Sequence, residues 1–283
     1  MLKTVKVLDK STREALYSGT IIKLKLNSAT ALCNFFTSHF LDDSFTSNPH
    51  HLSTAERIAI CEKFETSTEI QRLYTDIFKE AGLTHNETHW DRLRLRVQHS
   101  GDPIDNYNDT TTFGAGKYSS TLPIHRDTWG SQISQQLNWW MPLKPLQKEC
   151  TLLIYPSYFN VPVPNLSKTW SLKELKKARK NKQPYPQLPT MDMATMLEKE
   201  EWENKLKLDA VPILIQPGEI LIFSGSHLHG SAVGGEAGSF TRFSTEVRTI
   251  NVLDCENGIG ATNVDGPDVP VPQKKWFHPL VLP

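Results

Sequence analysis

The sequence is short of the features that mark disulfide-rich, zinc-ribbon and membrane proteins. Only four of its 283 residues are cysteines, and no two of them form a CxxC pair. This scarcity argues against a zinc ribbon or a disulfide scaffold and is consistent with a reducing compartment. No apolar run approaches the roughly 18 residues that cross a membrane, and the N-terminus has no apolar stretch typical of a signal peptide. We therefore expect a cytoplasmic protein with no membrane partner.

The chain also has no excess of charge of either sign. Lys plus Arg and Asp plus Glu both number 31, so the formal net charge is zero. Proteins that bind nucleic acid through their overall charge usually carry a basic excess, so no nucleic-acid partner is expected. The one basic run, which ends at Lys182, is interpreted as a solvated helix face. The sequence carries no signal for a particular oligomeric state.

The first 90 residues are predicted to be mainly helical. Their apolar residues mostly recur at intervals of three and four, which is typical of helices with one buried face. The segment Ser53-Thr54-Ala55-Glu56 has the form of a capping box, so a helix is expected to begin there. The expected elements are a strand at 21–26 and helices at 32–40, from Ser53 onward and at 70–81.

From residue 91 onward, apolar and polar residues alternate, as in half-buried strands. A polar loop at 101–120 and a helical insertion at about 157–208 interrupt the strands, and we expect substrate choice to be made there. Helices followed by many short strands predict an α+β protein with a sandwich or jelly roll. The expected strands lie at 93–97, 133–142, 150–155, 211–215, 219–224, 228–233 and 239–250. We expect one domain over 1–283, with a mainly helical part at 1–90, a core at 91–250 and a tail at 251–283.

Two segments hold the candidate metal ligands. His125 and Asp127 are two residues apart, so on a strand both side chains would point to the same face. About a hundred residues later, His227 and His229 show the same spacing beside an apolar strand. Two histidines and one carboxylate on one face of a metal form the geometry of non-haem Fe(II) oxygenases. Strand geometry alone allows either His227 or His229 as the third ligand.

A third segment, at 240–248, places polar residues on one face of a predicted strand. Arg242 and Ser244 share this face, opposite the apolar Phe243. An arginine that faces a barrel interior requires a partner, and a dicarboxylate would supply one. Arginine binds a carboxylate through two parallel N–H groups, and serine adds a hydroxyl donor. The alternative is a surface strand with solvated charges. The same face also carries Glu246 and Arg248.

Together these segments resemble the Fe(II)/2-oxoglutarate-dependent dioxygenases, especially the phytanoyl-CoA dioxygenase-like family. The matching pieces are His125-x-Asp127, His229-Gly-Ser and Arg242-x-Ser244, in that order, and Arg242 follows His229 by thirteen residues. The resemblance spans roughly residues 91–250. It implies a double-stranded β-helix (a cupin-like jelly roll) at the centre of the α+β fold.

The resemblance also implies roles for individual residues. It places Fe(II) on His125, Asp127 and His229, and so favours His229 over His227. It assigns 2-oxoglutarate to Arg242, with Ser244 assisting. Arg248 is a further candidate for the cosubstrate carboxylate, but it lies about 20 Å from Arg242 along an extended strand, so both cannot fill the same role. It is better interpreted as a residue near the substrate or beside a metal ligand.

The activity implied is oxidation of a C–H bond in a small-molecule metabolite, such as an amino-acid-derived or secondary-metabolite intermediate. Fe(II), 2-oxoglutarate and O2 would take part, and succinate and CO2 would be released. Related halogenases have Gly or Ala in place of the carboxylate, so Asp127 indicates oxidation without halide. Two alternatives remain: a cupin-type metalloenzyme that uses no 2-oxoglutarate, and a non-catalytic jelly-roll binding module. Arg242-x-Ser244 argues against the first of these, which would have no dicarboxylate to hold.

Overall fold

The computed structural model describes residues 2–41, 52–104, 120–183, 186, 189–193, 198–267 and 276–280. Most of the expected loop, residues 105–119, lies outside this part of the chain, as do short pieces of the insertion and the tail. Among the described residues, no helix combines the length and apolar character needed to cross a membrane.

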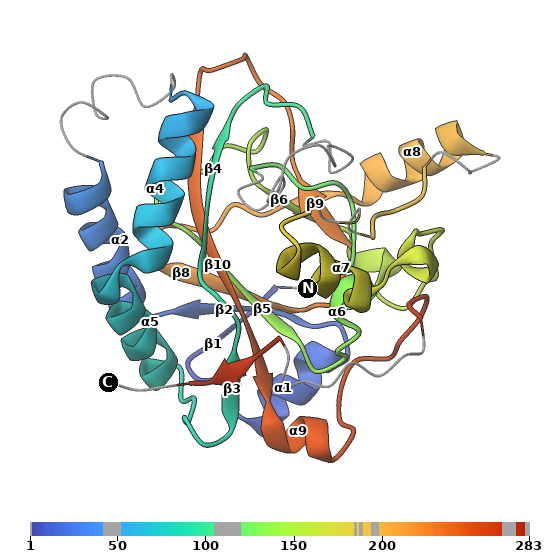
Figure 1. Cartoon of the computed structure of the whole chain (residues 1–283), viewed down its shortest axis with the longest axis horizontal. Coiled ribbons are helices and arrows are strands. Elements are labelled where there is room, and N and C mark those ends of the chain that lie inside the picture. Colours follow the sequence, from blue (N-terminus) through green and yellow to red (C-terminus); the bar gives the residue numbers. More distant parts are fainter. Residues whose placement is uncertain are drawn as a thin grey trace.

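The N-terminal part contributes both strands and helices. Strands β1 (Leu2–Val5) and β2 (Ile21–Lys25) pair in parallel, and α1 (Lys10–Tyr17) supplies the crossover that a parallel pair needs. Among the described residues, three helices follow and lie together on one side of the large sheet (Figure 1). They are α2 (Asn27–Phe40), α4 (Thr54–Thr66) and α5 (Thr68–Glu80). The expected capping box is present, because Ser53 and Glu56 each accept a hydrogen bond from the other's backbone N–H.

Within the described residues, the large sheet has eight strands and the small sheet three. The large sheet has the order β1-β2-β8-β5-β10-β3-β11, and β4 also pairs with β10. Its remaining strands are β3 (Thr88–Trp90), β4 (Arg94–His99), β5 (Leu137–Pro142), β8 (Glu219–Ser224), β10 (Thr241–Asn251) and β11 (His278–Pro279). The small sheet has the order β7-β6-β9, from β6 (Leu152–Ile154), β7 (Val211–Pro212) and β9 (His229–Ser231).

Alternation along the central strands separates two faces of the large sheet. On β5, Trp139 and Met141 join the apolar cluster formed with α2 and α5, whereas Trp140 joins a cluster with Leu152 and Ile154 of the small sheet. Polar residues at the same alternation, such as Asn138, therefore lie on the face turned toward the small sheet. This arrangement places a cavity with apolar walls and several polar side chains between the two sheets.

The remaining helices lie at the end of the small sheet and beyond β10 (Figure 1). They are α6 (Asp127–Ser131), the 3-10 turns at Pro156–Tyr158 and Ser167–Thr169, α7 (Leu172–Lys180), α8 (Lys199–Asp209) and α9 (Val252–Glu256). The expected α+β class with a double-stranded β-helix core is confirmed. Among the described residues, three short strands lie outside the predicted strand ranges: β1 and β3 in the part predicted to be mainly helical, and β11 in the predicted tail.

Candidate functional site

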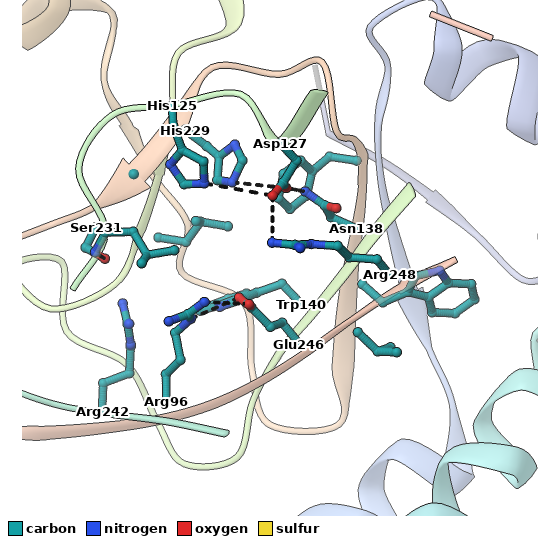
Figure 2. Close-up of a pocket in the computed structure, with 16 residues that line it drawn as sticks. Arg96, His125, Asp127, Asn138, Trp140, His229, Ser231, Arg242, Glu246 and Arg248 are labelled. Carbon is teal, nitrogen blue, oxygen red and sulfur yellow. Dashed lines mark hydrogen bonds and ion pairs between the residues drawn. The ribbon is translucent and has the colours of Figure 1, made fainter. Parts of the chain in front are cut away.

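His125 and His229 lie opposite each other on two paired segments. The backbone N–H of each residue donates a hydrogen bond to the backbone carbonyl of the other, at N···O distances of 2.8 and 2.9 Å. Their rings are therefore 4.3 Å apart, centroid to centroid. The sequence predicted a strand face for His125 and Asp127, and this is wrong for Asp127, which is the first residue of α6. The chain turns into this short helix immediately after the bridge, and the carboxylate still points toward both rings (Figure 2).

The Gly-Ser that follows His229 explains how the two segments approach so closely. A side chain at Gly230 would bring a Cβ within 3.3 Å of the Cα of Ile124, so glycine leaves room for the neighbouring backbone. Ser231 accepts a hydrogen bond from the backbone N–H of Leu122 through its Oγ, at 2.8 Å. Both residues thus fix the pairing that brings His125 to His229.

The three side chains form a compact cluster, in which Asp127 and His229 are buried and His125 is partly buried. One ligand atom from each of His125, Asp127 and His229 lies within 4.8 Å of the others. The Nε2 atoms of His229 and His125 are 3.6 and 4.0 Å from the Asp127 carboxylate oxygens. Among the described residues, this is the one group of three or more potential ligands that could hold a metal ion.

Hydrogen bonds set the tautomer of each histidine. Nδ1 of His125 lies 2.8 Å from the carbonyl of Pro123, and Nδ1 of His229 lies 2.9 Å from the carbonyl of His227. A carbonyl can only accept, so each Nδ1 carries the hydrogen and each Nε2 keeps its lone pair. Burial lowers the pKa of both rings, that of His229 to about 3. Neutral imidazoles with a free Nε2 are the form that binds a metal.

The carboxylate of Asp127 is held by two donors. Nη2 of Arg248 lies 2.6 Å from Oδ1 of Asp127, and the side-chain amide of Asn138 donates a hydrogen bond to Oδ2. Burial by itself would raise the pKa of Asp127, but its charged surroundings, foremost the positive charge of Arg248, outweigh burial and lower that pKa. Asp127 is therefore a carboxylate over the ordinary pH range.

Arg242 and Ser244 lie on β10, on the face turned toward the cavity, with 2% and 1% of their surface exposed. Nη2 of Arg242 donates to the carbonyl of Ser120 at 3.1 Å. Its Nε has no hydrogen-bond partner among the described residues, and neither has Oγ of Ser244. Buried polar atoms without partners are costly, so these two suit a ligand with acceptor oxygens, such as a carboxylate. Arg242 borders the cavity directly, whereas Ser244 is not among the residues that line it.

A second ion pair borders the cavity, between Arg96 of β4 and Glu246 of β10. Arg96 donates to both carboxylate oxygens of Glu246, at 2.6 and 3.1 Å. Burial alone would raise the pKa of Glu246, but Arg96 outweighs burial and holds that pKa well below its usual range. The sequence placed Glu246 on the correct face but did not indicate this pairing. The signal that could have indicated it is the alternation of Arg94 and Arg96 on β4, because β4 pairs with the part of β10 that carries Glu246.

The cavity between the two sheets is lined by all of these groups except Ser244 (Figure 2). Its apolar walls come from both sheets, and its polar groups come mainly from β10 and the His125–Asp127 segment. The lining residues are Arg96, Leu122, His125, Asp127, Asn138, Trp139, Trp140, Leu152, Phe223, His229, Gly230, Ser231, Arg242, Glu246, Val247 and Arg248.

His227, the competing candidate, lies away from this cluster. It is fully buried, and its Nδ1 and Nε2 are each 3.2 Å from a backbone carbonyl, of Ser224 and Gly19 respectively. Its ring packs against Phe159 with centroids 4.5 Å apart. The structure therefore brings His229, and not His227, to His125 and Asp127.

Comparisons with known proteins identify related folds. No protein-family model matches the chain, and no curated protein sequence matches it. Among solved structures, EctD from S. alaskensis, crystallised with 2-oxoglutarate and 5-hydroxyectoine, aligns with a TM-score of 0.50 and 14% identity over 94% of this chain and 83% of that chain. EvdO2 from Micromonospora carbonacea var. aurantiaca, complexed with 2-oxoglutarate, aligns with a TM-score of 0.45 and 11% identity over 96% of this chain and 99% of that chain. At 14% identity, the similarity to EctD is one of fold.

Proposed function

We propose that this protein is a non-haem Fe(II)/2-oxoglutarate-dependent oxygenase whose metal ligands are His125, Asp127 and His229. The observation that carries this proposal is the compact, largely buried cluster itself, in which two neutral imidazoles present Nε2 toward one carboxylate. Two histidines and one carboxylate are the ligand set of the non-haem Fe(II) oxygenases, and they leave metal positions open for a cosubstrate and O2.

Arg242 and Ser244 are proposed to hold the distal carboxylate of 2-oxoglutarate. The support is the buried Nε of Arg242 and the buried Oγ of Ser244, neither of which has a partner among the described residues. EctD, a solved structure of similar fold, contains 2-oxoglutarate. The sequence resemblance to the phytanoyl-CoA dioxygenase-like family gives the same assignment.

When bound, iron with 2-oxoglutarate and O2 would supply the oxidation of a substrate C–H bond, with release of succinate and CO2. The chain itself binds and orients these groups and excludes water. Trp140, Leu152 and Phe223 form an apolar wall beside the cluster, which limits water around the reacting groups. The carboxylate at Asp127 favours oxidation without halide.

The proposed substrate is a small-molecule metabolite, since the cavity lies between two sheets and is enclosed by side chains of both. EctD, of similar fold, was crystallised with a small molecule, 5-hydroxyectoine. We also propose that residues 1–283 form one dioxygenase domain. In support, strands from the N-terminal part, the core and the tail belong to the same large sheet.

Anaerobic addition of Fe(II) and 2-oxoglutarate tests the proposal. Wild-type protein should develop the weak visible charge-transfer band of iron-bound 2-oxoglutarate, and Asp127→Ala should not. A protein that binds Fe(II) without this band would be a cupin-type metalloenzyme that uses no 2-oxoglutarate. Folded protein that binds no divalent metal would be a non-catalytic binding module.

A further inference from the structure

Both oxygens of the Asp127 carboxylate are occupied by donors from neighbouring strands. We propose that Arg248 and Asn138 are positioning residues that hold Asp127 in the orientation required for metal binding. The inference rests on the proposed role of Asp127 as a metal ligand. It removes Arg248 from the candidates for the 2-oxoglutarate anchor and gives it a different task.

Arg248 and Asn138 are directly opposite each other on the paired strands β10 and β5. Cross-strand partners have side chains that emerge side by side on the same face of a sheet. Arg248 reaches Oδ1 of Asp127 and Asn138 reaches Oδ2. The strand register therefore places one donor on each side of the carboxylate, as Figure 2 shows.

Arg248 is itself fixed by Asp91. The backbone N–H of Arg248 donates to Oδ1 of Asp91 at 2.9 Å, and its Nη1 lies 3.8 Å from Oδ2 of the same residue. Arg94 pairs with Asp91 at 2.6 Å, which fixes that carboxylate in turn. The guanidinium thus makes a close ion pair with Asp127 and a longer electrostatic contact with Asp91, while the backbone of the same residue is bonded to Asp91.

Asn138 is oriented by Gln136. Nε2 of Gln136 lies 2.9 Å from Oδ1 of Asn138, so this oxygen accepts and the amide nitrogen of Asn138 is directed at Asp127. Gly225 leaves the space for this arrangement, because a Cβ there would lie 3.1 Å from Nε2 of Gln136 and 3.4 Å from Cβ of Asp127. Residues 136, 138 and 127 form one directed chain of hydrogen bonds.

The consequence is a carboxylate that cannot rotate freely. Each oxygen of Asp127 accepts a hydrogen bond from one protein donor. Each also keeps a lone pair for a metal, on the side of the Nε2 atoms of the two histidines. A ligand that is ordered before the metal arrives loses less conformational freedom on binding, which favours affinity. Partners that orient metal ligands typically change metal affinity or activity by roughly 10–100-fold when they are replaced.

Two variants separate positioning from charge. Arg248→Lys keeps the positive charge near the metal but replaces the planar guanidinium, with its several N–H donors, that contacts Asp127. Asn138→Leu changes no charge and removes the amide donor at similar size. The matched control is Arg13→Lys, since Arg13 also forms a partly buried pair with an aspartate, Asp254, at 2.6 Å. Arg13 and Asp254 are not among the residues that line the cavity.

Two dissociation constants are measured by calorimetry. The first is that of Mn(II) in the absence of 2-oxoglutarate, and the second is that of 2-oxoglutarate on Mn(II)-saturated protein. We expect both site variants to bind Mn(II) roughly 10–100-fold more weakly, with Arg13→Lys at the wild-type value. Circular dichroism checks the fold of each variant. If Arg248→Lys does not fold, Asn138→Leu carries the test alone.

Wild-type Mn(II) affinity in a folded Asn138→Leu or Arg248→Lys protein would overturn the role of that residue. Unchanged Mn(II) affinity together with weakened 2-oxoglutarate binding in Arg248→Lys would identify Arg248 as a cosubstrate anchor instead. Failure of the wild-type protein to bind Mn(II) or Fe(II) would contradict the proposed function itself, so the two failures are distinguishable.

Discussion

Nε of Arg126 lies 3.2 Å from Oδ2 of Asp265, and this pair ties the residue between two candidate metal ligands to the segment after α9. Arg126 is only 2% exposed and also donates to the carbonyls of Ser226 and Tyr158. Asp265 accepts further from the indole N–H of Trp129 at 2.6 Å. The pair therefore joins the His125–Asp127 segment, the turn near Tyr158 and the C-terminal part of the chain.

Asp265→Asn should destabilise the protein. The substitution leaves the buried Arg126 cation without its counterion, and breaking a buried pair in this way costs about 3–5 kcal/mol. Urea unfolding followed by tryptophan fluorescence measures the change in the free energy of unfolding. The control is Asp76→Asn, because Asp76 pairs with Arg72 where the two side chains are 39% and 49% exposed, and such pairs contribute about 0–1 kcal/mol. Equal free energies of unfolding for the two variants would contradict the proposed contribution of the Arg126–Asp265 pair to stability.

Arg242→Ala should mainly weaken 2-oxoglutarate binding. A hydrogen bond to a charged group contributes about 1.5–3 kcal/mol, which corresponds to roughly 10–100-fold in the dissociation constant. Titration of 2-oxoglutarate into Mn(II)-loaded protein measures the effect, and Mn(II) binding without cosubstrate should be unchanged. The conservative control is Arg242→Lys, which keeps the charge and should lose less affinity. An unchanged 2-oxoglutarate affinity in Arg242→Ala would move the anchor to another cation of the cavity.

Much of this site can be predicted from local patterns in the sequence. Alternation on β10 places Arg242, Ser244, Glu246 and Arg248 on one face, and three of them, Arg242, Glu246 and Arg248, line the cavity. The predicted groups His125, Asp127 and His229 meet in one cluster. Two-residue spacing predicted the convergence of His125 and Asp127, although Asp127 begins a helix rather than continuing a strand. A five-residue helix is too short for its apolar period to be read.

The positioning contacts could not be predicted in this way. Arg126 and Asp265 are 139 residues apart in the chain, and the backbone of Arg248 bonds to Asp91 across 157 residues. Such contacts depend on which strands become neighbours and in what register, and neither is encoded in the period of one strand. The edge strand β11 has two residues, which is too few for any alternation to appear.

The buried His227 should make the stability of the metal-free protein depend on pH. Burial lowers the pKa of His227 to about 4 from 6.5. Between these values the unfolded chain takes up a proton at this position and the folded protein does not, so stability falls as pH decreases from about 6.5 to about 4. One pKa unit corresponds to about 1.4 kcal/mol, so His227 accounts for up to about 3 kcal/mol of this loss.

Urea unfolding of metal-free protein between pH 4.5 and 7 tests this dependence. His125 and His229 titrate in the same direction, with the pKa of His229 lowered to about 3, so wild-type protein alone cannot separate the three histidines. His227→Gln removes the titrating group at position 227 and should make stability less dependent on pH. The same dependence on pH in His227→Gln and wild-type protein would show that His227 is not the source.

Asp127→Ala should abolish oxidation of the substrate. The change removes the one carboxylate of the ligand cluster, and it leaves Arg248 and Asn138 with donors directed at an empty position. The cation of Arg248 would then face a divalent metal without an intervening negative charge, so metal binding should weaken as well. Screening metabolites for substrate-dependent succinate formation identifies a substrate with the wild-type protein, and the same assay is then applied to the variant. Retained turnover to the wild-type product would rule out Asp127 as a required ligand, whereas loss of both turnover and Mn(II) affinity in a folded variant is the result that the geometry predicts.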